Sequence, residues 1–457
     1  MGDPSSTILS MEEDYRLGQA FMRNLRQNVE IVENPELNTY INSLGYRLLS
    51  GTGSQLDFNF FIVNDPSINA FAGPGGHIGI HSGLILAAKS EGELAAVMAH
   101  EIAHVTQRHL ARAFQKASNV QLQAAAAILA AIILGSPELS AALVTTATAS
   151  SIQQQLNFTR SHEKEADRVG IDILINSGFS ADNMPAFFSR LQENYRYMES
   201  NLPELLRTHP VTPNRIADSQ NRASQVPKIK DQPSPSFSFI QAKLYSMDDV
   251  KHDNRLKEIE VRLDQGEPLS AAQRYEYALF QYERGKLSEA EHYSQTLLEQ
   301  MPENVSFIAL QAQIELKKNH SETAIKRLHK ALLLFPYQPQ LSTLYATALL
   351  QNGQPKKAAE TMRTFIQQQH KFALPSYYQL LAKAEMAAER YASSYMALAD
   401  YYYMIGQTRT AIDQLETALS HSKGDNTFQT ERIKSQLAYL KSEALEAQRL
   451  EKTSEAN

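Results

Sequence analysis

The apolar positions at the start of the chain recur at helical spacing. Residues 11–29 place large apolar side chains one turn apart, and Ser10 followed by Glu13 has the spacing of a capping box. A second helix is expected over residues 35–51, beginning with a proline at its first position and ending at a glycine. Both segments are expected to be scaffold helices.

The period then changes to that of a β-strand. Residues 57–64 are aromatic and β-branched and end at an Asp-Pro pair, which predicts a strand. Residues 69–85 are punctuated by glycines, and their middle alternates like a second strand. Glycines let another backbone approach, so this strand is a candidate edge for binding an extended substrate peptide. The candidate edge residues are Gly76, His77, Ile78, Gly79 and Ile80.

Two histidines in this glycine-rich stretch share one face of the predicted strand. His77 and His81 are four residues apart, which is compatible with a metal pair. We expect them instead to be two partly exposed residues of a hairpin.

The next helical segment contains an HExxH element. Ser90 and Glu93 predict a capping box for a helix that reaches about Phe114. Within that helix His100 and His104 lie one turn apart on one face and can bind one zinc ion. Glu101 lies beside them, where it can take a proton from water. By the same helical geometry His109 points away from this face and is expected at the surface.

Residues 124–134 form the most apolar stretch of the chain, and a second run of small residues covers 141–149. Eleven residues make a helix of about 16 Å, roughly half of a bilayer core, so a transmembrane span is not expected. We expect a helical hairpin that packs over the HExxH helix. The alternative is a segment that makes a peripheral membrane contact or binds unfolded substrate.

Composition limits the chemistry of any metal site. The chain has 457 residues, 43% of them hydrophobic and 21% charged, and a net charge of -6, which gives no footprint for nucleic acid. It has no cysteine, so a zinc site must use histidine and carboxylate ligands. Residues 1–6 have no charged segment followed by an apolar core, so the sequence as given predicts no leader peptide.

A carboxylate ligand is available downstream, in the helical segment from Arg160 to Ser177. Glu163 and Asp167 are four residues apart and share a face, whereas Glu165 is turned about 200° from Glu163. We predict Glu163 as the third zinc ligand. Asp167, one turn further on, is placed to accept the free ring N–H of a ligand histidine. The plain alternative is a solvated acidic helix with ordinary ion pairs.

Four motifs in this order resemble the M48 zinc metallopeptidases over roughly residues 10–225. The motifs are HExxH at 100–104, the Glu163-Lys164-Glu165-Ala166-Asp167 segment, Asn69-Ala70-Phe71-Ala72 with Pro74-Gly75-Gly76, and Thr208-His209-Pro210 with Arg215. The resemblance implies a gluzincin-type site with one Zn²⁺ per chain, bound by the two HExxH histidines and Glu163, with Glu101 as general base. It also implies that His209 faces the metal, either stabilising the oxyanion or closing the fourth coordination position, and that Arg215 supports the ligands.

A 34-residue repeat follows a linker that is rich in proline and serine. The columns Ala278/Ala312/Ala346 and Ala290/Ala324/Ala358 keep this step, and Gly285/Asn319/Gly353 fall at the turns between paired helices. This is the register of tetratricopeptide repeats. The fit weakens after His370, where residues 373–395 are expected to form an irregular helix pair.

The predicted fold class is mainly α with a small β-sheet: a gluzincin-type metallopeptidase domain followed by an α-solenoid. The expected domains are a disordered or non-native start at 1–9, the peptidase domain at 10–225, a linker at 226–238, the repeat domain at 239–450 and a disordered tail at 451–457. Stacked helix pairs present a concave surface that suits peptides and protein partners.

A peptidase of this kind followed by such repeats resembles the β-barrel-assembly-enhancing proteases of Gram-negative bacteria. The resemblance implies a periplasmic quality-control endopeptidase that acts on unfolded or misassembled outer-membrane proteins, with the barrel-assembly machinery as a partner of the repeats. Two other hypotheses remain: a chaperone or adaptor scaffold with a capped metal site, and a cytoplasmic peptidase.

Overall fold

The N-terminal helices form where the apolar pattern predicts them. Helix α1 (Met11–Asn28) begins with a complete capping box, because Ser10 Oγ accepts from the Glu13 N–H and the Glu13 carboxylate accepts from the Ser10 N–H. Helix α2 (Pro35–Ser50) follows. The computed structural model describes residues 10–54, 56–114, 126, 129–130, 160–195, 203–231, 234–369, 373–422 and 427–455.

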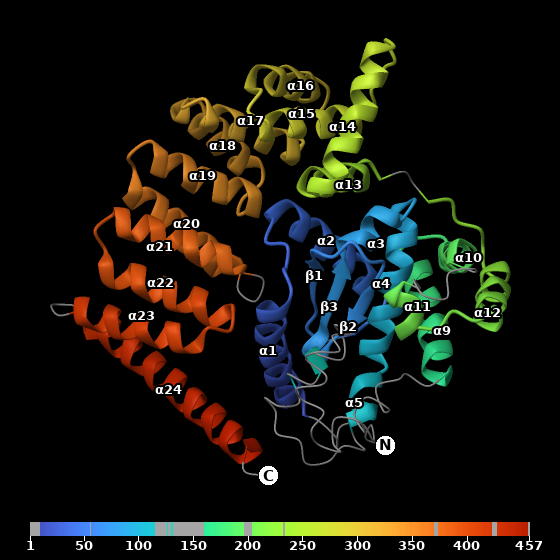
Figure 1. Cartoon of the computed structure of the whole chain (residues 1–457), viewed down its shortest axis with the longest axis horizontal. Helices are drawn as coiled ribbons and strands as arrows, with labels where there is room; N and C mark the ends of the chain where they lie inside the picture. Colours follow the sequence, from blue (N-terminus) through green and yellow to red (C-terminus); the bar gives the residue numbers. More distant parts are fainter. Residues whose placement is uncertain are drawn as a thin grey trace. The chain divides into compact units, whose positions relative to one another are not determined.

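The chain divides into two compact units, which are described separately below. The first contains Met1–Val32 and Leu37–Gln241, and the second contains Glu33–Glu36 and Ala242–Asn457. Figure 1 shows the first unit mainly in blue and green and the second mainly in yellow, orange and red.

The first unit contains a three-stranded sheet in the order β1-β3-β2. Strand β1 (Asn59–Val63) runs parallel to β3 (His77–His81), and the short β2 (Ala70–Ala72) pairs antiparallel with β3 on its other side. The prediction that Gly76, His77, Ile78, Gly79 and Ile80 form a free edge is therefore wrong, because β3 is paired on both sides. In the described part of the sheet the strand at that edge is β2.

The two histidines of β3 are buried, which corrects their predicted partial exposure. His77 Nδ1 lies 3.1 Å from the side-chain amide nitrogen of Asn59, and His81 Nδ1 lies 2.8 Å from Ser67 Oγ. Their partners come from neighbouring strands and turns of the same unit. These contacts give both side chains a structural role in the sheet.

The predicted HExxH helix is interrupted. Helix α4 (Glu91–Thr106) ends two residues before Arg108, whose φ of 54° is left-handed, and a separate helix, α5 (His109–Phe114), then begins. The start of α4 is also simpler than predicted: Ser90 Oγ caps the Glu93 N–H, but the Glu93 carboxylate accepts from the Lys89 N–H instead of that of Ser90.

The predicted hairpin over residues 124–149 lies outside the described residues except at three positions. Ala126, Leu129 and Ala130 are helical and buried, and they belong to the apolar cluster that includes Leu17 and Phe21 of α1. None of the helices formed by the described residues combines the length and apolar character that crossing a bilayer requires.

The described part of the first unit contains five further α-helices. α9 (Arg160–Asn176) packs along α4, and α12 (Pro213–Ser224) contacts α9. α10 (Asn183–Tyr195) contacts both α4 and α12, and α11 (Glu204–Thr208) leads into the loop before α12. The remaining short helix, α3 (Ser82–Ala87), follows β3 directly. α9 and α10 thus pack directly on α4, and α12 packs on both of them.

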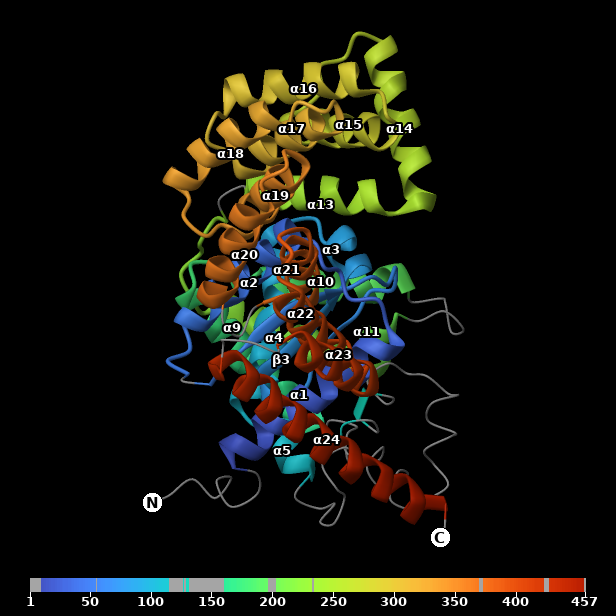
Figure 2. The same cartoon turned by 90° about the vertical axis from the view of Figure 1, so that its left-hand side faces the viewer.

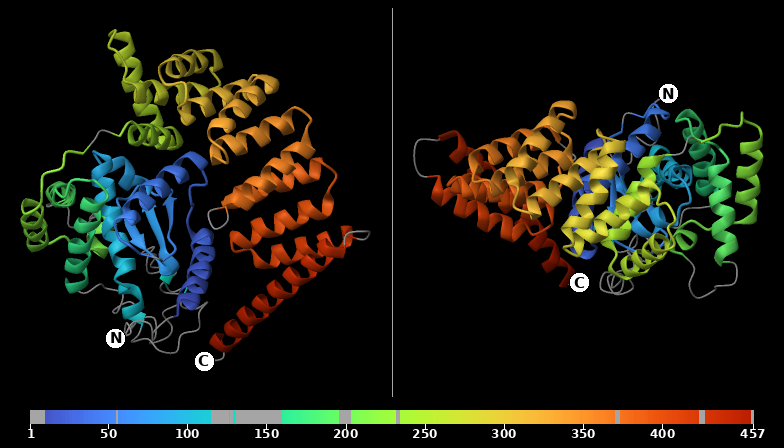
Figure 3. Two further views of the ribbon diagram at one scale, coloured as in Figure 1. Left: turned by 180° about the vertical axis from the view of Figure 1, so that it is seen from behind. Right: turned by 90° about the horizontal axis from the view of Figure 1, so that it is seen from above.

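From α14 onwards, the second unit is built from helices that each pack on the next along the chain (Figures 2 and 3). The helices are α13 (Pro235–Met247), which continues from the first unit, α14 (Asp249–Asp264), α15 (Ala271–Glu283), α16 (Leu287–Gln300), α17 (Val305–Lys317), α18 (Ser321–Leu334), α19 (Pro339–Gln351), α20 (Pro355–Gln369), α21 (Pro375–Ala387), α22 (Tyr391–Met404), α23 (Thr408–His421) and α24 (Thr427–Glu455).

The repeat register is confirmed at its turns and small-residue columns. Gly285, Asn319 and Gly353 all have left-handed φ, of 74°, 62° and 68°, where one helix of a pair turns into the next. The predicted small residues are fully buried: Ala278, Ala290, Ala312, Ala324, Ala346 and Ala358. The small side chains let the paired helices approach closely.

The expectation of an irregular pair after His370 is wrong. α21 and α22 are regular helices joined by a turn at Glu389, whose φ is 62°. This turn falls 36 residues after that at Gly353, so the step is longer but the unit is intact. The last helix, α24, continues to Glu455, beyond residue 450 where the sequence places the end of the repeats.

Candidate metal centre

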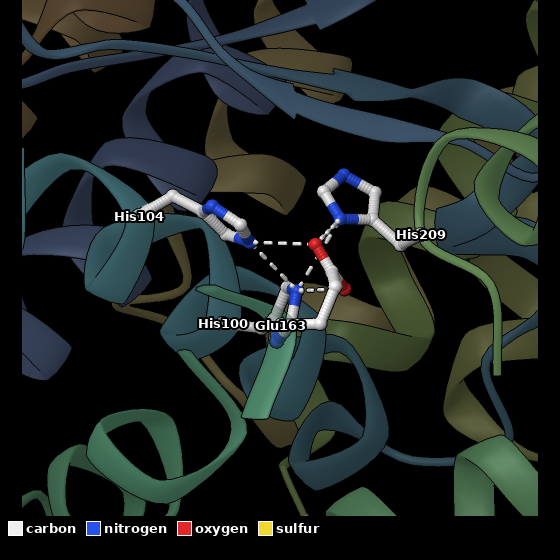
Figure 4. Close-up of side chains that lie close together, drawn as sticks. All are labelled: His100, His104, Glu163 and His209. Atoms are coloured by element: carbon white, nitrogen blue, oxygen red, sulfur yellow. Dashed lines mark hydrogen bonds and ion pairs between the residues drawn. The ribbon is translucent and has the colours of Figure 1, made fainter. Parts of the chain in front are cut away.

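Helix α4 carries the three residues of the HExxH element into the interior of the unit. His100 and His104 are each 2% exposed and Glu101 is fully buried. The two histidines lie one turn apart, and their Nε2 atoms are 3.0 Å from each other (Figure 4). Two imidazole nitrogens at this distance in a buried site can bind one cation.

The third group is Glu163, at the start of α9. Its Oε1 lies 3.4 Å from His104 Nε2 and its Oε2 lies 3.5 Å from His100 Nε2. The packing of α9 along α4 produces this arrangement, in which the predicted ligand faces both histidines. Glu165 points away from the cluster, as the helical geometry predicts.

His209 joins the same cluster from the end of α11. Its Nδ1 lies 3.0 Å from Glu163 Oε1 and 3.4 Å from His100 Nε2, and its Nε2 lies 3.6 Å from Glu101 Oε1. His100, His104, Glu163 and His209 thus offer four ligand atoms that all lie within 4.8 Å of one another. The residue pattern around His209 does not predict that this side chain faces the metal site; only the family resemblance implies it.

Asp167 and Arg215 surround the cluster. Asp167 Oδ1 lies 3.0 Å from His100 Nδ1, on the opposite side of the ring from the cluster. Arg215 donates to both oxygens of Asp167 through Nε and Nη2, each at 2.7 Å, and its Nη1 lies 2.8 Å from Glu163 Oε2. Nη1 also donates to the carbonyl of Pro210, the residue after His209. Arg215 therefore connects α9 to the loop that carries His209.

The charges in this cluster depend strongly on one another. Burial disfavours the charged ring of His100, but the facing carboxylates of Asp167 and Glu163 outweigh burial and raise the pKa of His100 to about 10. Burial likewise opposes ionisation of Glu163, yet His209 and His100 hold the pKa of Glu163 well below its ordinary value. Burial and the neighbouring charge of His100 lower the pKa of His104. The site thus favours an ionised carboxylate with at least one positive charge beside it.

The donor set fits zinc. Ligand atoms bound tetrahedrally at about 2.0–2.2 Å are roughly 3.4 Å apart, which is close to the separations found here. Neither oxygen of the Glu101 carboxylate has a hydrogen-bond partner among the described residues, although both are buried, and Oε2 of Glu163 is buried with the Arg215 guanidinium beside it. A cation would compensate these buried charges, which are otherwise costly.

His109 is buried and contacts the cluster, which corrects its predicted place at the surface. Its Nδ1 lies 3.0 Å from His104 Nδ1, and its Nε2 lies 3.2 Å from Glu165 Oε2. The helix break at Arg108 explains the error, because His109 no longer follows the helical rotation of α4. Burial outweighs the contact with Glu165 and lowers the pKa of His109 to about 4, so the ring is neutral at neutral pH.

Phe188 of α10 is a second residue that the sequence analysis missed. The rings of Phe188 and His100 pack edge to face, with their centroids 6.3 Å apart. The guanidinium carbon of Arg215 lies 5.2 Å from the centroid of the Phe188 ring. Phe188 covers one side of both residues. An apolar residue in an amphipathic helix carries no signal that would have identified this position.

The comparisons with known proteins agree with this geometry. Residues 35–223 match the model of peptidase family M48, and residues 315–384 match a tetratricopeptide-repeat model. Over 427 residues the chain is 35% identical to the β-barrel assembly-enhancing protease of Escherichia coli (strain K12), a match that covers 93% of this chain and 87% of that protein. The chain belongs to peptidase family M48. The predicted family, fold class and metallopeptidase activity are thereby confirmed.

Two further relatives show how far the M48 similarity extends. A putative β-barrel assembly-enhancing protease of Vibrio cholerae is 44% identical over 247 residues, covering 53% of this chain and 51% of that protein. A mitochondrial metalloendopeptidase of Arabidopsis thaliana is 30% identical over 155 residues, covering 34% and 29%. An M48 metallopeptidase requires a metal ion, and the cluster of His100, His104, Glu163 and His209 is compatible with one.

Proposed function

We propose that this chain is a zinc endopeptidase in which His100, His104 and Glu163 bind the metal and Glu101 is the general base. The observation that carries the proposal is the buried cluster of ligand atoms within 4.8 Å, beside a glutamate that has no hydrogen-bond partner among the described residues. Membership of family M48 supports the same assignment.

The bound zinc would polarise the scissile carbonyl and lower the pKa of water. Glu101 takes the proton of the attacking water on a carboxylate oxygen and delivers it to the nitrogen of the leaving amine. Its lack of hydrogen bonds keeps the lone pairs of both oxygens available for this transfer. Asp167 holds His100 through Nδ1, so that Nε2 remains directed at the cluster. Arg215 holds Asp167 in turn.

Under this proposal, His209 would supply a fourth ligand to the metal in the resting enzyme. Its Nδ1 lies beside Glu163 and His100, within the spacing of the other ligand atoms. The same observation favours a second candidate function, a chaperone or adaptor whose metal site remains capped. An oxyanion role for His209 requires this ring to face substrate instead.

The variant His209→Ala separates these roles. Capping predicts that the rate of cleavage of an unfolded protein rises in His209→Ala, whereas an oxyanion role predicts a loss of roughly 10²–10³-fold. Zinc content is measured in parallel, so that a fall in activity from metal loss is recognised. No cleavage by either form, with one zinc bound per chain, would favour the scaffold function.

The relatives named β-barrel assembly-enhancing proteases suggest the biological setting. We propose a periplasmic enzyme of envelope quality control whose substrates are unfolded or misassembled outer-membrane proteins. The repeat unit would bind a protein partner, such as the barrel-assembly machinery, on the surface that its stacked helices present. An extended substrate would pair with β2 rather than with the central β3.

This setting is tested with purified protein and one barrel protein offered in two states. We expect cleavage of the unfolded barrel protein and resistance of the same protein after assembly in detergent. Equal cleavage of both states, or of neither, would contradict the proposed substrate class.

A further inference from the structure

The second nitrogen of His104 has an unusual partner. Nε2 of His104 faces the ligand cluster, so Nδ1 is the nitrogen that orients the ring. Histidine ligands commonly hold this second nitrogen on a carboxylate or a backbone carbonyl. Here the partner is another imidazole, since Nδ1 of His109 lies 3.0 Å from Nδ1 of His104.

The hydrogen bonds allow one assignment of protons if His104 binds a metal. Nε2 of His104 must then offer a lone pair, so Nδ1 carries the proton and donates it to Nδ1 of His109. Nδ1 of His109 must be an acceptor, which places the proton of this neutral ring on Nε2. That N–H donates to Glu165 Oε2, 3.2 Å away. The chain of bonds ends on a carboxylate, which is an acceptor when ionised.

We propose that His109 is a positioning residue for the metal site, fixing the tautomer and ring orientation of His104 while Glu165 fixes those of His109. The inference rests on the proposed zinc site. It gives the two ligand histidines different supports: His100 is held directly by Asp167, and His104 is held through an intermediate ring. The helix break at Arg108 is what turns His109 back towards His104.

The immediate surroundings of this chain of bonds support a dedicated role. His109 is fully buried although Glu165 has a 30% exposed side chain, so the imidazole spans the distance from the interior to the surface. His162 stacks on His109 with ring centroids 4.5 Å apart and an interplanar angle of 16°. Arg112 Nη1 lies 3.5 Å from the same Glu165 oxygen. The stacked ring and the arginine lie beside the chain of bonds and form none of the links between His104, His109 and Glu165.

The test measures zinc affinity by competition with a chromophoric chelator, at one pH and without substrate. His109→Leu keeps a similar volume but removes both nitrogens, and we expect zinc affinity to fall by about 10–100-fold. His109→Asn restores an acceptor oxygen near the position of Nδ1 and should bind zinc within about threefold of the parent. His162→Asn is the matched control, because it changes the stacked ring without touching the bonds, and should also stay within about threefold.

The outcomes separate positioning from packing. Parental affinity in His109→Leu would show that His109 only fills space, and an equal loss in His109→Asn would show that its acceptor is irrelevant; either result overturns the proposal. If the parent itself binds no zinc, the proposed function fails instead. Circular dichroism and the unfolding midpoint of the metal-free forms identify a folding defect.

A second variant decides the question if His109→Leu does not fold. Glu165→Ala removes a partly exposed acceptor from the far end of the chain of bonds, and we expect a loss of about 3–10-fold in zinc affinity. Arg112→Ala, which removes a neighbouring charge, is its control and should change affinity by less than about twofold. Equal affinities in Glu165→Ala and Arg112→Ala would overturn the proposal.

Discussion

Two buried glutamates, one in each unit, have opposite surroundings. Glu276 of α15 is 2% exposed, and Arg255 donates to both of its oxygens at 2.9 Å. Glu101 of α4 is fully buried, and neither oxygen has a hydrogen-bond partner among the described residues. The same side chain is thus hydrogen-bonded through both oxygens in the repeat unit and accepts no hydrogen bond from the described residues in the peptidase unit.

The difference is consistent with a structural role for Glu276 and a chemical role for Glu101. Burying an unpaired carboxylate is unfavourable, and the guanidinium of Arg255 compensates that cost at Glu276. At Glu101 the cost persists in the protein alone and would be reduced by a cation in the adjacent cluster. A proton acceptor needs free lone pairs, so the lack of a partner at Glu101 is a requirement of its proposed role.

The largest effect is expected from removing the carboxylate of Glu101. Glu101→Gln should lower kcat/KM for an unfolded protein substrate by roughly 10²–10⁴-fold, because the amide cannot accept the proton of water. Zinc content should remain that of the parent, since Glu101 is not a proposed ligand. Full peptidase activity in Glu101→Gln would show that Glu101 is not the general base, and its surroundings would then differ from those of Glu276 for another reason.

The ligand assignment within α9 is the next test. Glu163→Gln replaces a charged ligand carboxylate that faces both histidines. Loss of a residue that only supports a ligand costs about 10–100-fold in metal affinity, so this loss of a ligand should reduce zinc affinity by more than about 100-fold. Glu165→Gln is the matched control two residues away, where the amide oxygen can still accept from His109, and should keep its zinc. Chelator competition on both variants gives the comparison, and equal zinc loss would contradict the choice of Glu163.

Much of the fold was accessible from the sequence because its signals are local. The capping box at Ser10, the strand over residues 59–63 and the repeat turns depend on residues close together in the chain. The edge position of β2 was not accessible. Three residues carry no recognisable period, and the order of strands depends on which segments pair across the sheet.

The residues of the site likewise divide into those that a local sequence pattern places and those that only the packing of distant segments places. Helical spacing places His100 and His104 on one face and Glu163 opposite Glu165, and the structure has this arrangement. His109 was misplaced because the rule assumes an uninterrupted helix, whereas Arg108 adopts a left-handed backbone that nothing in its residue type predicts. His209 has no local signal, since only the packing of α11 brings it to the cluster.

A smaller effect on stability is expected on the repeat side of the comparison. Glu276→Gln keeps the shape of the side chain but replaces charged hydrogen bonds to Arg255, and should lower the free energy of unfolding by about 1–3 kcal/mol. Peptidase activity on a short unstructured peptide should be unchanged. Urea unfolding followed by circular dichroism measures the first quantity, and no change in the midpoint would mean that the bonds to Arg255 contribute nothing.

A further effect separates the two regions by its dependence on pH, in metal-free protein. The carboxylates of Asp167 and Glu163 outweigh burial and raise the pKa of His100 to about 10, against about 6.5 for an unfolded histidine. A raised histidine pKa contributes stability that is complete below pH 6.5 and is lost as the pH rises through 10. The urea midpoint should therefore fall more steeply between pH 7 and 10 in the parent than in His100→Gln.

The repeat variant supplies the reference for this measurement. The hydrogen bonds that Arg255 donates to Glu276 raise the pKa of Arg255 further above its usual range, so the guanidinium keeps its charge from pH 7 to 10. Glu276→Gln should lower the midpoint by the same amount at both ends of that range. Parallel pH curves for the parent and His100→Gln would mean that the proton held at His100 does not stabilise the fold. The buried charges of the peptidase unit would then be as independent of pH as the pair in the repeats.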